Sequence, residues 1–180
     1  MRARDELLLM RLRQDLPAFP EEVLNEWIAR CARRLLWPPT DPGWTSILLW
    51  LPIQAWAAMT WTEEDRPLEW DHLSTNSALI VRRLYDAHFK RDPRAAALVP
   101  DDGFARVIQA MDYVREHGVM PGRIAVLAGP DGRLALADGC HRVTGYFTYR
   151  NILTVPALRA GLPQPAAEVN ANQPMWVARI

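Results

Sequence analysis

The sequence predicts an α+β fold, in which an N-terminal helical region packs on a small α/β domain. Apolar residues recur at three- and four-residue steps in several segments of the first ninety residues, which is typical of helices. Short apolar runs on either side of a Gly-Pro-Asp-Gly loop at 129–132 indicate two strands joined by a hairpin. With 180 residues, 49% of them hydrophobic, the chain can bury a core, which excludes disorder as its main state.

We expect three parts along the chain. Residues 1–95 form a helical region rich in tryptophan, and residues 96–160 form the α/β domain. Residues 161–180 contain three prolines and are expected to form a tail that packs on the surface.

The first part opens with two predicted helices. Leucines spaced by three or four residues lie on one face of a helix over 4–16, and Pro17 ends it. Pro20 and the two glutamates after it are typical of a helix start, because acidic groups there complement the helix dipole. The apolar spacing of this second helix continues to Leu35.

Six tryptophans lie between residues 37 and 70, and two interpretations of them remain open. They fill the core between packed helices, or they form an aromatic face for an apolar ligand, a protein partner or a second copy of the chain. The core interpretation, which we favour, predicts that Trp44, Trp50, Trp56 and Trp61 are largely buried.

The remaining elements follow from similar patterns. One helix is expected over 71–89, capped by Ser74 or Thr75, and another runs from a cap at Asp101 or Asp102 to His117, where a glycine follows.

A strand at 123–127, a return strand at 134–136, a helix over 140–149 and a short strand at 154–158 complete the prediction.

The charges argue against nucleic acid and membrane as partners. Lys plus Arg is 21 and Asp plus Glu is 21, so the basic excess of a non-specific nucleic-acid binder is missing. Residues 44–62 carry no charge, but they include a proline and polar side chains, and tryptophans occur along the segment instead of at its ends. Two cysteines and a charged start without a signal sequence indicate a reducing cytoplasm.

The segment Asp138-Gly-Cys-His-Arg142 carries the predicted chemistry. A strand ends there, Gly139 permits a tight turn, and a helix begins with free N–H groups that can bind an anion. Arg142 adds a planar fork that matches phosphate oxygens, and His141 can donate a further hydrogen bond.

Each of these residues also has a plainer interpretation. The dipole and the neighbouring arginine would lower the pKa of Cys140, while a small core residue is the alternative. Asp138 would accept a proton or hold Mg²⁺, while an ordinary turn with a salt bridge is the alternative.

The order of elements around this segment resembles the ParB/sulfiredoxin-like superfamily over about residues 100–160. Gly139-Cys-His-Arg142 looks like the sulfiredoxin motif, in which the cysteine is catalytic and the His-Arg pair binds ATP phosphates. The Asp-Gly-x-His-Arg pattern is also similar to that of the free-serine kinases.

The resemblance implies an enzyme that uses ATP, or another nucleotide, with Mg²⁺ and transfers phosphate to a small-molecule or protein acceptor. The expected phosphate-binding residues are Gly139, Cys140, His141, Arg142 and Thr144. The expected catalytic residues are Asp138, which would also hold Mg²⁺, Cys140 and His141.

Two alternatives stay open. One is a ParB-like nuclease or partition-type nucleotide-binding protein, although no DNA-reading module follows the motif. The other is a non-catalytic interaction module that uses its tryptophans to bind a partner.

Overall fold

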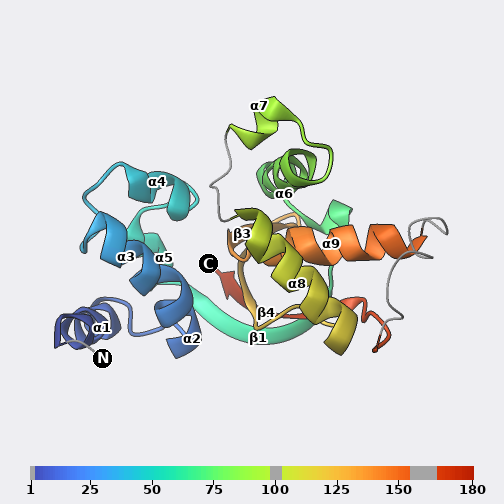
Figure 1. Cartoon of the computed structure of the whole chain (residues 1–180). Coiled ribbons are helices and arrows are strands. Elements are labelled where there is room, and N and C mark those ends of the chain that lie inside the picture. The colour runs from blue at the N-terminus through green and yellow to red at the C-terminus, as the bar shows by residue number, and fades with distance from the viewer. Residues whose placement is uncertain (1–2, 98–102, 155–165) are drawn as a thin grey trace.

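A four-stranded mixed sheet lies between two groups of helices in the computed structural model of the chain, which describes residues 3–97, 103–154 and 166–180 (Figure 1). The strand order is β1-β4-β2-β3. The strands are β1 (Thr60–Pro67), β2 (Ile124–Ala128), β3 (Leu134–Asp138) and β4 (Asn172–Arg179). β4 runs antiparallel to β1 and parallel to β2, while β2 and β3 form an antiparallel hairpin.

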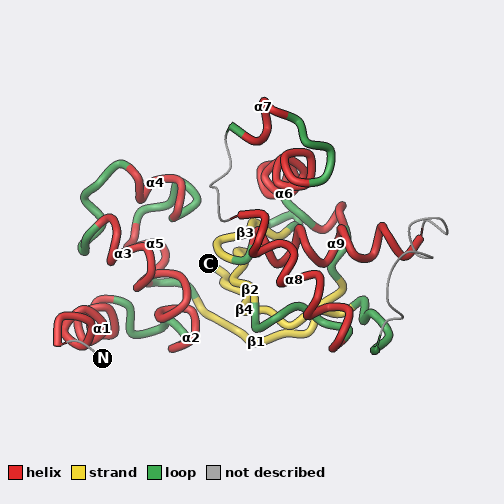
Figure 2. The backbone as a smooth tube through the Cα atoms, in the orientation of Figure 1, coloured by secondary structure: helices red, strands yellow, loops and turns green. Residues whose placement is uncertain are grey.

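The N-terminal helices cover one face of the sheet (Figures 1 and 2). They are α1 (Ala3–Asp15), α2 (Glu21–Val23), the π-helical η1 (Leu24–Ile28), α3 (Ala29–Leu35), α4 (Gly43–Ile47) and α5 (Ile53–Ala57). Their core contains Trp27, Trp44 and Trp56 and contacts the sheet through Ala125 and Ala178.

The other face carries the remaining helices. They are the 3-10 turn η2 (Trp70–His72), α6 (Thr75–His88), α7 (Pro93–Ala96), α8 (Gly103–His117) and α9 (Cys140–Thr154). α9 packs against α6 and α8, and its Val143, Tyr146 and Phe147 share a core with Val126 and Val177. Neighbouring residues of β2 therefore enter opposite cores, as the period of a strand requires.

α8 and α9 come unusually close where they cross. A Cβ at Gly145 would lie 2.7 Å from Ala110 Cβ and 2.8 Å from Val107 O, so only glycine fits there. This close crossing brings the side of α8 next to the first turn of α9.

The predicted helices at 4–16, 71–89 and 140–149 and the hairpin are confirmed, with small shifts of their ends. Ser74 caps α6, since its Oγ accepts a hydrogen bond from Ser77 N at 3.4 Å. The expected cap at 101–102 lies outside the described residues. The strand expected at 154–158 also lies outside them, apart from Thr154, which ends α9.

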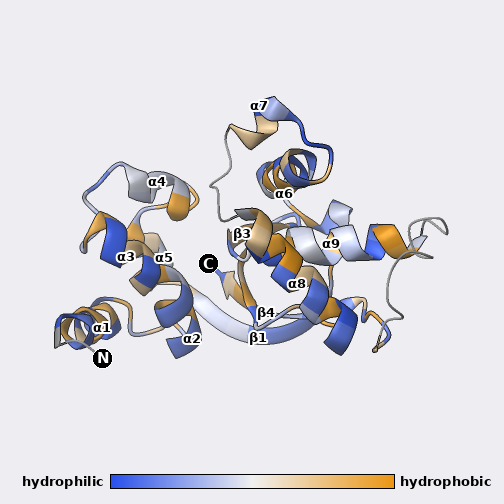
Figure 3. Ribbon diagram, viewed as in Figure 1, coloured by the Kyte–Doolittle hydropathy of each residue, from blue (hydrophilic) through white to orange (hydrophobic). Residues whose placement is uncertain are grey.

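The prediction that the C-terminal residues form a surface tail is wrong, because residues 172–179 form β4 in the interior of the sheet. The expected boundaries at 95 and 160 do not separate independent units either, since β1 comes from the first part and β4 from the last. The sequence did not predict β1, because most of its side chains are hydrophilic and a strand pattern needs alternating apolar residues (Figure 3).

The tryptophan prediction is confirmed in part. Trp44 and Trp56 are buried, and their indole N–H groups donate to Leu36 O at 3.1 Å and Leu48 O at 2.9 Å. Trp61 is partly buried against the same core. Trp50 contradicts the prediction, because it is 74% exposed.

The charge-free run 44–62 is divided among α4, α5 and the start of β1. Within the described ranges, no helix has both the length and the apolar character needed to cross a membrane.

We predict that truncating two of these tryptophans changes the free energy of unfolding by very different amounts. Trp56→Ala should reduce the free energy of unfolding by about 3–5 kcal/mol, because it empties a fully buried site. Trp50→Ala, the matched control, should change it by less than about 0.5 kcal/mol, because the side chain is exposed. Urea unfolding measures both values, and similar losses in the two variants would contradict this assignment of core and surface.

Candidate functional site

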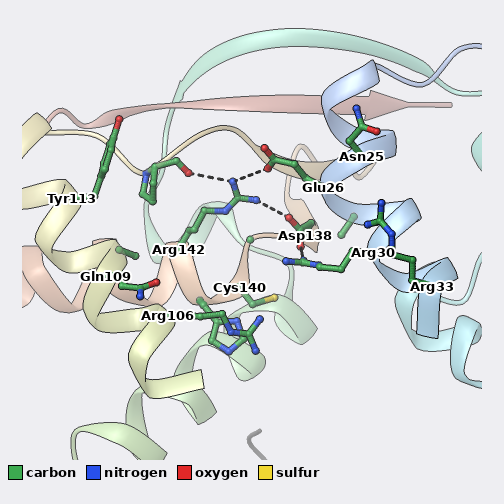
Figure 4. Close-up of a pocket in the computed structure, with 15 residues that line it drawn as sticks. Asn25, Glu26, Arg30, Arg33, Arg106, Gln109, Tyr113, Asp138, Cys140 and Arg142 are labelled. Carbon is green, nitrogen blue, oxygen red and sulfur yellow. Dashed lines mark hydrogen bonds and ion pairs between the residues drawn. The ribbon is translucent and has the colours of Figure 1, made fainter. Parts of the chain in front are cut away.

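The Asp138–Arg142 turn opens into a pocket of about 700 Å³ between the two groups of helices (Figure 4). One wall comes from η1 and α3, the opposite wall from α8, and the floor from the end of β3 and the start of α9. Residues from parts of the chain more than one hundred positions apart therefore share this pocket.

Gly139 fixes the geometry of the turn. Its φ is +101°, and a Cβ there would lie 2.4 Å from Ile124 Cγ2, so a larger residue would clash with β2. α9 begins at the next residue, and Val143 N donates to Gly139 O at 2.9 Å. The N–H groups of the first turn precede this bond and lie at the positive end of the helix, as an anion site requires.

The Asp138 carboxylate joins the α3 wall to the floor of the pocket. Its Oδ1 accepts a hydrogen bond from Arg30 Nη2 at 2.7 Å, and its Oδ2 accepts one from Arg142 Nη2 at 2.6 Å. Arg142 Nη1 also donates to Pro121 O at 3.2 Å and lies 3.5 Å from Glu26 Oε2 (Figure 4). The side chains of Asp138 and Arg142 are only 14% and 18% exposed, so solvent screens this pair less than a surface ion pair.

The described lining of the pocket is rich in arginine although the whole chain is neutral. Among the described residues, four arginines line it, and its carboxylates are Glu26 and Asp138. The arginines are Arg30, Arg33, Arg106 and Arg142. Arg33 also donates to Asp5 Oδ1 at 3.0 Å, which offsets part of its charge. A lining with more guanidinium groups than carboxylates favours an anionic ligand.

The π-helical turn η1 shapes the wall that faces α8. It directs Leu24, Trp27 and Ile28 into the core, while Asn25 and Glu26 line the pocket. Such turns are rare and occur frequently at functional sites.

The structure brings five of the six predicted site residues together. Asp138, Gly139, Cys140, His141 and Arg142 all line the pocket.

Thr144 does not line the pocket, because it is buried and its Oγ1 donates to Cys140 O at 2.8 Å within α9. That bond leaves its hydroxyl engaged inside the helix and away from any bound phosphate.

Sequence reasoning missed the four charged residues that other elements contribute: Glu26, Arg30, Arg33 and Arg106. They lie on polar helix faces, and such faces carry no signal that distinguishes a pocket from solvent.

The expectation of a low pKa at Cys140 is wrong. Burial, together with the nearby carboxylate of Asp138, raises the pKa of this thiol to about 12. Arg142 opposes the shift only weakly, since its guanidinium is already paired with Asp138. The thiol is therefore protonated at neutral pH and a poor nucleophile.

The residues present do not fit Mg²⁺ bound by Asp138. Both of its carboxylate oxygens already accept from arginines. Across the part of the chain that is described, no three His, Cys, Asp or Glu side chains gather in a group that could hold a metal ion.

We predict that Cys140 resists alkylation in the folded protein. In a Cys31→Ser variant, iodoacetamide labelling at pH 8.5, where an ordinary thiol is about half ionised, should be at least tenfold slower than in 8 M urea, because burial keeps Cys140 protonated. Mass spectrometry across a pH series measures the rate. Half-maximal labelling below pH 8.5 would show that the thiol is activated after all.

Comparisons with protein-family models, with curated proteins and with solved structures find no match for this chain.

Proposed function

We propose that this chain is a nucleotide-dependent enzyme that binds the phosphates of ATP or another nucleotide at the start of α9. The observation that carries the proposal is the convergence of four arginines from α3, α8 and α9 on one pocket, beside the first turn of α9, whose N–H groups lie at the positive end of the helix. An arginine fork matches the geometry of phosphate oxygens, and the helix end adds donors that need no reorganisation.

We further propose that residues 100–160 are a ParB/sulfiredoxin-like unit. The succession α8, β2, β3, Asp138–Arg142 turn and α9 supports this, since it is the order on which the resemblance rests. We also propose a reducing cytoplasm as the compartment, because Cys31 and Cys140 are both free thiols.

The reaction we propose is transfer of a phosphate to a small-molecule or protein acceptor. Most of the catalysis would come from alignment and charge stabilisation. Arg142 would bind the phosphates, with Asp138 as the positioning residue that holds its guanidinium. His141 lines the same pocket and is the group we propose for proton transfer, because imidazole exchanges protons near neutral pH.

Binding can be tested before the acceptor is known. A thermal-shift panel of ATP, CTP, ADP, tripolyphosphate and phosphate, each with and without Mg²⁺, should show stabilisation by nucleotides. A ligand at one hundred times its Kd should contribute about 2.7 kcal/mol. No stabilisation by any member of the panel would contradict the proposal.

Two arginine variants test the location of the site. Arg142→Ala should weaken nucleotide binding by about 1.5–3 kcal/mol, because it removes hydrogen bonds to a charged group. Arg133→Ala is the matched control, since Arg133 lies on the exposed hairpin and pairs with Asp131. Isothermal titration calorimetry measures both affinities, and equal losses would place the phosphates elsewhere.

A further inference from the structure

We infer that the pocket has a second end, a nucleobase subsite at Tyr113 on α8; this inference rests on the proposed function. Arg106, Gln109 and Tyr113 follow one another at helical spacing and line the same pocket. Seven residues of α-helix span about 10 Å, so Arg106 and Tyr113 lie about that far apart along the pocket. In Figure 4, Arg106 and Tyr113 lie at opposite ends of the stretch of α8 that lines the pocket.

Tyr113 is built as a stacking surface. Its ring lies nearly parallel to that of His117, with centroids 4.0 Å apart and planes at 16°. A hydrogen-bond contact of 3.1 Å between His117 Nδ1 and Tyr113 O fixes the position of the imidazole. The tyrosine lines the pocket and is 36% exposed. Aromatic rings of this kind stack on any base, because every base presents a π-face.

An uncharged polar group accompanies the ring. Gln109 comes from the same wall as Tyr113, whereas Asn25 lies across the pocket on η1, where its Nδ2 donates to Glu21 Oε1 at 3.2 Å (Figure 4). A carboxamide both donates and accepts hydrogen bonds, as the edge of a base requires. The two ends therefore differ in chemistry: arginines and helix N–H groups suit phosphates, whereas the ring and the Gln109 amide suit a planar, polar heterocycle.

The test compares ligands that differ only in the base. Isothermal titration calorimetry at constant ionic strength measures the Kd values of ATP, CTP, GTP, UTP and an abasic ribose triphosphate, which keeps the sugar and the phosphates. We expect at least one nucleotide to bind at least fivefold more tightly than the abasic compound. Tyr113→Ala should abolish that preference and leave the affinity for the abasic compound within twofold.

Two variants separate stacking from a general loss of structure. Tyr113→Phe keeps the ring and should retain the preference. Tyr85→Ala removes a partly buried tyrosine of α6 that lies outside the pocket and stacks on Phe89. This variant should also retain the preference.

The outcomes distinguish the two proposals. If the abasic compound binds as tightly as every nucleotide, or if the preference survives in Tyr113→Ala, the base subsite is refuted and the phosphate site stands. If neither nucleotides nor the abasic compound bind, the proposed function fails and the subsite with it.

Discussion

The paired carboxylate of Asp138 holds the pocket together. Its two oxygens bind arginines from different layers, Arg30 from the N-terminal helices and Arg142 from α9. Removing one arginine would leave the other to compensate the charge, whereas removing the carboxylate would leave two cations facing each other across the pocket. The arrangement depends in turn on Gly139, because only its backbone conformation allows α9 to begin directly after β3. The single turn from Asp138 to Arg142 therefore connects α3 with the start of α9.

The same pairing explains why the helix dipole and the neighbouring arginine do not lower the pKa of Cys140. A helix N-terminus and an adjacent arginine favour a thiolate only if neither is already neutralised. Here Asp138 neutralises Arg142 and adds its own negative charge, and burial penalises the charged sulfur. The surroundings of the first turn of α9 therefore keep the sulfur of Cys140 in its neutral form.

Local patterns in the sequence predicted the elements whose evidence is local. α6, α8 and α9 have regular apolar spacing, and the 129–132 loop marks the β2–β3 hairpin. β1 and β4 could not be recognised in this way. Polar residues dominate β1, and β4 contains Pro174, a residue that argues against an interior strand. These two strands form because they pair with each other over eight residues, and no local window contains that information.

The residues of the site also differ in whether local sequence could predict them. The turn from Asp138 to Arg142 was predictable because one short segment holds a strand end, a glycine and a helix start. Arg30 and Arg106 were not, since they join the pocket only after two layers of helices pack on the sheet.

The interior position of β4 also constrains how the chain acquires its fold. β4 follows the other described strands in the chain, and it pairs with β1 on one side and β2 on the other. Until residues 172–179 leave the ribosome, β1 has no partner, and the apolar residues of β2 that flank the gap remain uncovered. Contacts between segments so distant in sequence slow folding and prolong exposure of unpaired strand edges. β1 therefore stays unpaired while residues 68–171 are synthesised, and the β2 edge of the hairpin stays open until β4 joins it, which leaves both edges vulnerable to aggregation.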